Sequence, residues 1–337
     1  MIPTVSYDDI RYRRQTCLNQ AAWADRRGQT VIELTGSDRM DLLHRLTTND
    51  LRAIAPGSGR QTVLLTDKAR IIDVVTLLQD EASTLLIGSP QASADIIQWV
   101  RKYVIMDDVR LRDRSTEFDA IEVMGPRAAD IVGQLTEIDV SAFTIAQWTA
   151  LDTPAGMLRI VRMPSPSEVS FWILGNNDAV DVLRRLLQAS SQQLPELSAD
   201  DLEVIRVLAG MGRRGHEWTL SYNPLEAGLL HLTSFVKGCY IGQEVVARLD
   251  SYNKVKQRIM GLISPLPLSQ DDQIIAEGAA VGLITSVVSG LDGTCWYALG
   301  YVRGEYAHAG TQIDVVHDGS NVRCELVLPP MTDPSCR

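Results

Sequence analysis

The chain has 337 residues, which at about 150 residues per domain predicts two domains with room for a third small one, and its 45% hydrophobic and 22% charged residues are typical of a folded protein. It carries 42 acidic and 32 basic side chains, a formal net charge of −10. We therefore expect no broad face for nucleic acid, because such faces need a basic excess. The apolar runs are shorter than the roughly 20 residues of a membrane-spanning helix, and the N-terminus shows no signal-peptide pattern.

Five cysteines are spread along the chain without a C-x-x-C pair, so neither a structural zinc site nor a thioredoxin-type motif is expected. The five histidines are equally scattered, and we expect His44, which falls in a predicted helix, to be structural. No phosphate-binding loop, dinucleotide-binding turn or nucleophile elbow occurs. These patterns predict a reduced, cytoplasmic protein without a metal site.

In chain order, the first clear pattern is a helix that Ser37 caps and that ends near residues 49–50. Ser93 caps a second helix. Between the two helices, β-branched and leucine residues predict three strands, at 62–66, 71–78 and 84–88.

The same order then repeats. Strands are predicted at 147–152, 157–163 and 169–174, followed by a helix at 178–187. Two successive β-β-β-α units of similar length predict two related lobes of antiparallel sheet, with helices packed on one face. The predicted class is α+β, because the strands arrive in runs without a helix after each one.

A third region starts with a helix. Ser198 and Asp201 form a capping box at its beginning, and the helix ends at Gly210. After a poorly periodic segment, short strands separated by turns predict a small β-barrel or sandwich. These strands are 258–264, 280–288, 295–302, 312–316 and 322–328. We place a domain boundary near residue 252, which gives regions 1–252 and 253–337.

The densest local signal is the run K-G-C-Y-I-G-Q-E at residues 237–244. Its two glycines bracket a tight loop, after which a helix is expected to begin at Gln243. Glu244 suits the first helical turn, and Arg248 four residues later can pair with it. Cys239 then precedes a helix N-terminus and lies two residues from the ammonium of Lys237, and both features favour a thiolate. The alternative is that Cys239 is a small buried filler in a glycine turn.

This run resembles the signature of the folate-binding YgfZ family, whose relatives include the glycine-cleavage T-protein (aminomethyltransferase). Other segments are similar to that superfamily, in the same order along nearly the whole chain: 46–51, 123–129, 223–229, 282–286 and 298–302. The resemblance implies a three-part ring around a central hole that holds tetrahydrofolate, with a C-terminal barrel.

The resemblance also implies a function. A YgfZ-like protein uses folate to support assembly or repair of iron–sulfur clusters in other enzymes, including those that modify tRNA. Its partners are folate and iron–sulfur client or assembly proteins, with no direct nucleic-acid or membrane contact. It implies that Cys239 is the functional thiol, Lys237 tunes it, and the loop is shaped or held by Gly238, Gly242, Gln243, Glu244 and Arg248. It implies that Asn49, Asp73, Arg206 and Tyr240 contact the cofactor and that Tyr240 lines the cavity.

Three positions depart from the T-protein pattern. Val74 stands where T-proteins carry the catalytic aspartate, and a valine cannot transfer a proton. Leu208 replaces the glutamate that contacts the pterin ring, and Gly88 replaces a pocket asparagine. Two alternatives therefore stay open: a folate-dependent aminomethyltransferase or demethylase in which Asp73 is the acid, and a scaffold that has lost its folate.

Overall fold

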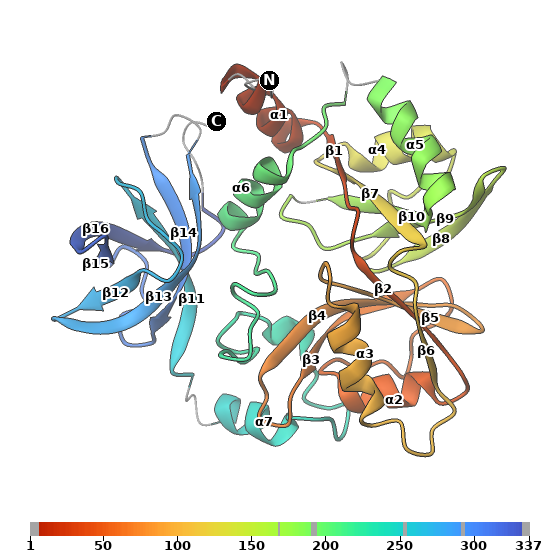
Figure 1. Ribbon diagram of the computed structural model, residues 1–337, viewed down its shortest axis with the longest axis horizontal. Coiled ribbons are helices and arrows are strands. Elements are labelled where there is room, and N and C mark those ends of the chain that lie inside the picture. Colours follow the sequence, from red (N-terminus) through yellow and green to blue (C-terminus); the bar gives the residue numbers. More distant parts are fainter. Residues whose placement is uncertain (1–6, 168, 190–193, 252–254, 291–293, 332–337) are drawn as a thin grey trace. The chain divides into compact units, whose positions relative to one another are not determined.

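The computed structural model describes residues 7–167, 169–189, 194–251, 255–290 and 294–331 (Figure 1). The chain divides into two compact units that alternate along the sequence. The two-sheet unit comprises Thr16–Leu197 and His231–Gln243. The barrel unit comprises Met1–Gln15, Ser198–Leu230 and Glu244–Arg337. The predicted boundary near residue 252 lies outside the described residues.

The two-sheet unit holds two five-stranded antiparallel sheets, with strand orders β3-β4-β5-β2-β6 and β1-β7-β10-β9-β8. The first sheet consists of β2 (Thr30–Thr35), β3 (Gly59–Leu65), β4 (Ile71–Gln79), β5 (Ser83–Gly88) and β6 (Arg110–Asp113). The second consists of β1 (Ala22–Asp25), β7 (Phe118–Met124), β8 (Trp148–Thr153), β9 (Gly156–Arg162) and β10 (Ser170–Asn176). The helices are α2 (Arg39–Leu46), α3 (Ser93–Arg101), α4 (Ala128–Thr136) and α5 (Asn177–Ala189).

This unit has four layers. The two sheets pack face to face through buried side chains from both, such as Leu78 and Ile87 against Trp148 and Trp172. Helices α2 and α3 bury their apolar faces on the first sheet, and α4 and α5 bury theirs on the second. Each apolar sheet face is thereby removed from water, which is the main stabilising term in such a fold.

Both predicted β-β-β-α units are present, as β3–β4–β5–α3 and β8–β9–β10–α5. Each sheet is completed by two strands that the sequence patterns did not predict, namely β2 and β6 in the first and β1 and β7 in the second. Strands β1 and β6 have only four residues, and β6 reads R-L-R-D. So short and charged a segment carries no readable alternation of apolar and polar residues.

The barrel unit contains a closed six-stranded barrel, in the order β11-β14-β13-β12-β15-β16. Its strands are β11 (Gln257–Ser264), β12 (Gln273–Ala276), β13 (Ala279–Ser289), β14 (Trp296–Arg303), β15 (Gln312–His317) and β16 (Ser320–Val327). The predicted α+β class, with two antiparallel lobes and a C-terminal barrel, is confirmed. Only the four-residue β12 was not predicted.

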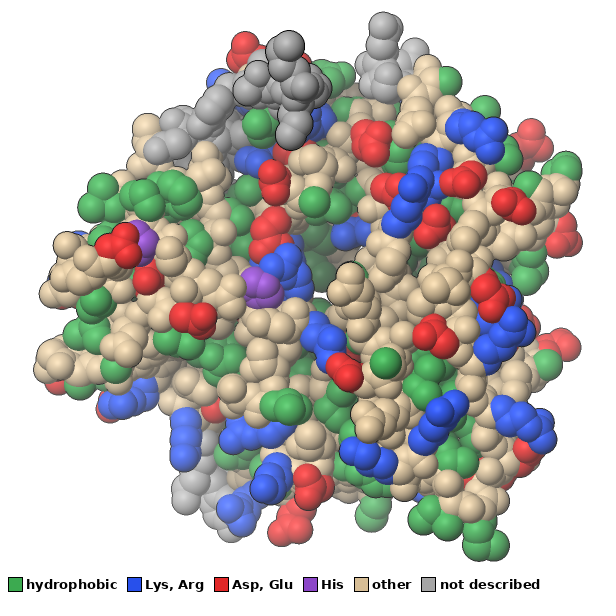
Figure 2. Space-filling model, viewed as in Figure 1, with side chains coloured by type: hydrophobic (Ala, Val, Ile, Leu, Met, Phe, Trp, Pro, Cys, Tyr) green, Lys and Arg blue, Asp and Glu red, His purple; other side chains and the backbone are tan. Residues whose placement is uncertain are grey.

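Helix α6 (Ala199–Ala209) packs on this barrel through Val204 and Val207. The predicted capping box is present, because Ser198 and Asp201 each accept a hydrogen bond from the other's backbone N–H. Asp201 also binds Arg13 and Arg14 of α1 (Tyr7–Asn19), each at 2.8 Å. Acidic and basic side chains are interspersed over the face shown in Figure 2, as is usual for a solvated surface. Among the described residues, no helix is long and apolar enough to span a membrane.

Candidate functional site

The signature run forms an irregular segment that ends at α7 (Gln243–Ser251), so the predicted start of that helix at Gln243 is confirmed. Residues 233–242 are called the thiol loop below. Gly238 and Gly242 have φ angles of +95° and +82°, which favour glycine. A Cβ at Gly242 would also lie 2.8 Å from the carbonyl oxygen of Thr66. The loop geometry therefore requires glycine at position 242.

Lys237 anchors the thiol loop to the C-terminal end of α2. Its side chain is 2% exposed, and its Nζ donates hydrogen bonds to the carbonyl oxygens of His44, Thr47 and Asn49, at 2.7, 2.7 and 2.5 Å. The last carbonyls of a helix have no partner within the helix, and a cation there is favourable. Burial lowers the pKa of Lys237 to about 7, although the nearby Asp50 carboxylate opposes this shift. The amine thus points to backbone carbonyls of residues 44–49.

His44 returns the contact. Its Nε2 donates to the carbonyl oxygen of Lys237 at 3.1 Å, and its Nδ1 accepts from the backbone N–H of Leu51 at 3.2 Å. These partners define a neutral ring with its proton on Nε2. Burial, and then the charge of Lys237, lower the pKa of His44 and keep it neutral. Sequence reasoning expected His44 to be structural but did not link it to the signature run.

Backbone contacts complete this attachment. The N–H groups of Ser234 and Ile241 donate to the carbonyls of Thr48 and Arg45, at 2.9 and 3.0 Å. The Thr48 hydroxyl donates to the carbonyl of Leu232 at 2.7 Å. We call these bonds, with those of Lys237 and His44, the clasp. It joins the segment 232–241 to residues 44–49.

Cys239 is exposed. The alternative interpretation of this thiol as a buried filler is therefore wrong. Val236, three residues before it, is 94% exposed, while Lys237 points inward. The clasp thus fixes the loop and leaves the thiol facing solvent.

Tyr240 follows the thiol and is 7% exposed, with its ring centre 5.1 Å from the Nζ of Lys237. Burial raises the pKa of its hydroxyl to about 12. That hydroxyl is buried and has no hydrogen-bond partner among the residues that the structure describes. Gln243 accepts a hydrogen bond from the backbone N–H of Tyr240 at 3.3 Å, a contact within the signature run. Glu244 and Arg248 are both exposed on α7.

A cavity of about 530 Å³ opens in the two-sheet unit. Its lining comes from the segment before β3 and from β3, from the segments before β8 and after β9, and from η1 (Leu230–Leu232). The lining residues are Asn49, Ala53, Ile54, Ala55, Ser58, Gly59, Arg60, Gln61, Thr144, Ile145, Gln147, Pro164, His231 and Leu232. Of the predicted cofactor residues, Asn49 is in this lining. Its amide nitrogen donates to the carbonyl of Gln61 at 2.9 Å.

Asp73 lies on β4 and is fully buried. Its carboxylate accepts hydrogen bonds from the hydroxyl and backbone N–H of Ser89, at 2.6 and 2.9 Å, and from the N–H of Val74 at 2.9 Å. Val74 is 6% exposed. The structure thus ties Asp73 into the first sheet and does not include it in the cavity lining.

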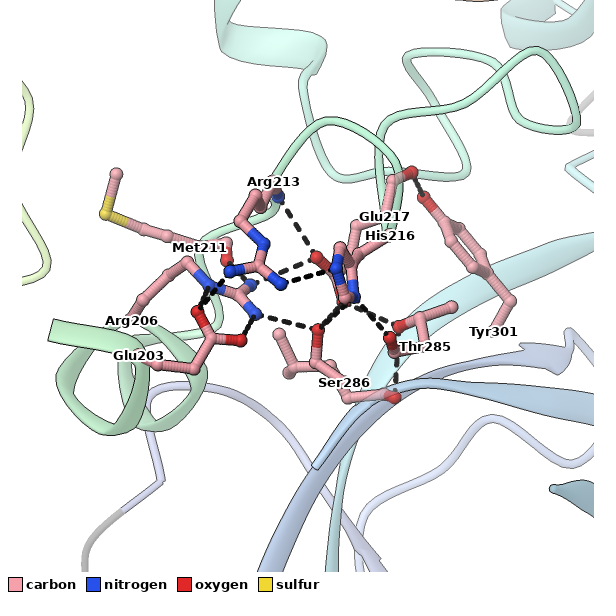
Figure 3. A network of polar contacts seen from close by, with 10 residues as sticks. Glu203, Arg206, Met211, Arg213, His216, Glu217, Thr285, Ser286 and Tyr301 are labelled. Carbon is pink, nitrogen blue, oxygen red and sulfur yellow. Dashed lines mark hydrogen bonds and ion pairs between the residues drawn. The ribbon is translucent and has the colours of Figure 1, made fainter. Parts of the chain in front are cut away.

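Arg206 lies in the barrel unit, within the polar network of Figure 3. Its guanidinium donates to both oxygens of Glu203, at 3.0 and 2.6 Å, and to Glu217 at 3.0 Å. It also donates to the Met211 carbonyl and to the Ser286 hydroxyl, at 2.6 and 2.7 Å. The carboxylates raise the pKa of Arg206 although burial opposes them. Because all five donors are used, the structure favours a structural role over the predicted cofactor contact.

Glu217 is the buried centre of this network and is 0% exposed. Its carboxylate also accepts from the hydroxyls of Thr285 and Ser286, at 2.6 and 2.7 Å. Sequence reasoning missed Glu217, which lies in the poorly periodic segment after α6. Leu208, at the pterin-glutamate position, packs on the apolar cluster between α6 and the barrel.

Comparison with known proteins agrees with this architecture. The model of the GCVT N-terminal domain matches residues 7–237, and that of the glycine cleavage T-protein C-terminal barrel domain matches residues 257–333. A candidate transferase of the Arabidopsis thaliana chloroplast is 30% identical over 300 residues, 88% of this chain and 68% of the relative. A mitochondrial aminomethyltransferase of Mesembryanthemum crystallinum is 25% identical over 332 residues, 94% of this chain and 80% of the relative.

A solved structure has the same fold. The glycine cleavage system aminomethyltransferase T of Bartonella henselae superposes with a TM-score of 0.84 at 18% identity, covering 96% of this chain and 90% of that one. At this identity the likeness concerns the fold alone. The family models together match most of the chain, in the order of its two sheets and its barrel. The chain therefore belongs to the glycine cleavage T-protein family.

Proposed function

We propose that this chain is a YgfZ-like, folate-binding member of its family that supports assembly or repair of iron–sulfur clusters, including those of tRNA-modifying enzymes. The observation that carries the proposal is the presentation of Cys239. The clasp holds the loop through a buried lysine, and the thiol faces solvent. A thiolate is a preferred ligand of iron in clusters, so an exposed and positioned thiol suits contact with a cluster of a client protein.

Tetrahydrofolate is proposed to occupy the cavity of the two-sheet unit. A volume of about 530 Å³ falls within the usual range for small-molecule sites. Asn49, Gln61 and Gln147 bring amide groups to the lining, which suit the donors and acceptors of a pterin ring. Arg60 is exposed at the cavity and suits the glutamyl carboxylates. When bound, tetrahydrofolate supplies nitrogens that accept one-carbon groups.

Val74 argues against aminomethyl transfer. It places an apolar side chain where T-proteins carry the catalytic carboxylate, and a valine cannot exchange a proton. Asp73 is the remaining acid nearby, but its oxygens already accept three hydrogen bonds. A one-carbon transferase using Asp73 is therefore the second candidate. Turnover of an aminomethyl donor with tetrahydrofolate, abolished by Asp73→Asn, would establish it.

The test of the first candidate is complementation in a strain that lacks this protein. Wild-type protein is expected to restore the activity of iron–sulfur enzymes, while Cys239→Ser restores little. The matched control is Cys295→Ser, which removes a half-buried thiol of the barrel unit and is expected to behave as wild type. Full rescue by Cys239→Ser would remove the thiol from the account.

A further inference from the structure

Two stretches of chain both line the cavity and hold the thiol loop. Asn49 is in the cavity lining, and its backbone carbonyl accepts the 2.5 Å hydrogen bond from Lys237. His231 and Leu232 are also in the lining, and they lead directly into the loop that carries Cys239. All of these residues belong to the two-sheet unit. The cavity and the thiol are therefore joined within one compact body.

The thiol loop depends on the clasp for its local stability. Phe235 and Val236 are 43% and 94% exposed and Cys239 is exposed, so the stretch 235–239 buries little apolar surface, while Tyr240 and Ile241 at the end of the loop pack inward. Segments with few buried apolar contacts open locally at low cost. In the stretch 235–239, what opposes opening is mainly polar, namely the three bonds from Lys237 and the bond from His44, and the backbone bonds to residues 45 and 48 hold the loop on either side.

We infer that Lys237 is a positioning residue that couples occupancy of the cavity to docking of the loop that presents Cys239. A ligand that touches Asn49 on one side and His231 and Leu232 on the other contacts both partners of the clasp. It therefore binds the docked loop more tightly than the open one and shifts the population toward the docked state. Coupling of this kind is reciprocal, so the docked loop also raises the affinity for the ligand.

This inference rests on the proposed function, because it takes folate as the ligand of the cavity. It assigns folate a task that needs binding but no proton transfer. Such a task is compatible with Val74 at the position where T-proteins carry a catalytic carboxylate. The ligand favours the docked loop, and the hydrogen bonds of Lys237 hold Cys239 in its exposed position there.

The experiment measures hydrogen exchange of the peptide 231–243 by mass spectrometry, in the full chain with and without 5-formyltetrahydrofolate. In wild-type protein, saturating ligand is expected to slow exchange of this peptide by about tenfold, within the usual range of coupling between sites. In Lys237→Met, exchange is expected to be faster without ligand and to slow less than about twofold when ligand is bound. The affinity of Lys237→Met for the ligand, measured by calorimetry, is expected to fall by the same factor by which the coupling is reduced.

The matched control is Lys102→Met, which removes an exposed lysine at the end of α3 and is expected to exchange as wild type does. Wild-type protein that binds the ligand without slowed exchange would overturn the inference and leave the proposed folate site intact. Equal slowing in wild type and Lys237→Met would also overturn it. Absence of binding in calorimetry would instead overturn the folate assignment, and the coupling with it. The wild-type comparison needs no variant, so it stands even if Lys237→Met does not fold.

Discussion

Lys237 and His44 exchange hydrogen bonds in both directions. The lysine amine donates to the His44 carbonyl at 2.7 Å, and the imidazole Nε2 donates to the Lys237 carbonyl at 3.1 Å. The two residues are 193 positions apart in the sequence. This pair fixes the most specific motif of the chain to the end of a helix, and burial lowers the pKa of both side chains.

Lys237 is expected to make the protein more stable as pH rises from about 7 to about 10.5. Its pKa is about 7 in the folded chain and near 10.5 when exposed, so the unfolded state binds more protons in this range. The free energy of unfolding therefore increases with pH, by at most about 1.4 kcal/mol per pH unit for this group. Urea unfolding at several pH values measures the slope. Lys237→Met should flatten it and Lys102→Met should not; parallel curves for wild type and Lys237→Met would contradict the assignment.

His44 is expected to remain neutral below its ordinary pKa. Burial and the charge of Lys237 lower the pKa of this imidazole, so protonation below pH 6.5 favours the unfolded state and stability falls as the solution is acidified. Nuclear magnetic resonance of the ring reports its titration directly. A pKa at or above 6.5 in the folded protein would refute the neutral tautomer.

Gly242→Ala is expected to destabilise the two-sheet unit. The new Cβ would meet the Thr66 carbonyl oxygen at 2.8 Å, and the residue would also have to hold a φ of +82°. Gly215→Ala is the matched control, since its φ is +84° but no atom lies within 4 Å of its Cβ. Both variants bear the cost of a positive φ, about 1 kcal/mol. The free energy of unfolding of Gly242→Ala should fall by at least about 1 kcal/mol more than that of Gly215→Ala because of the clash. Equal decreases would show that the loop moves to accommodate the new Cβ without cost.

Glu217→Gln is expected to lower the free energy of unfolding of the barrel unit by about 1–3 kcal/mol. The buried carboxylate accepts hydrogen bonds from a guanidinium and from hydroxyl groups, and an amide replaces it in the variant. The control is Glu305→Gln, where the acid forms an exposed pair with Arg303 at 3.3 Å. Exposed pairs contribute at most about 1 kcal/mol. Thermal unfolding of both variants compares them. Similar changes in melting temperature for the two variants would mean that the network around Arg206 contributes little to the stability of the barrel unit.

Local patterns predicted much of this fold. The capping box of Ser198 and Asp201, both β-β-β-α units and five of the six barrel strands follow from short-range signals. The short strands β1 and β6 could not be read, because four residues are too few to show periodicity. The start of α7 at Gln243 also follows from the sequence, whereas the sequence left open whether Cys239 is exposed or buried.

The sequence did not predict the direction of the Lys237 side chain. It was expected to act on the thiol two residues away, and it instead binds carbonyls nearly two hundred positions upstream. Contacts at such separations leave no periodic signal. The role of Glu217 was hidden for the same reason, since its partner hydroxyls come from β13, 68 and 69 positions later.

The most direct test of the account is calorimetric titration of the purified chain with tetrahydrofolate, beside Gln61→Leu and the control Gln134→Leu. Gln61 lies in the cavity lining, while Gln134 is exposed on α4. We expect micromolar binding by wild type and Gln134→Leu, and binding about tenfold weaker by Gln61→Leu, which would lose the hydrogen bonds proposed between its amide and the ligand. Absence of binding by wild type, or binding unaffected by Gln61→Leu, would contradict the folate site proposed for the two-sheet unit.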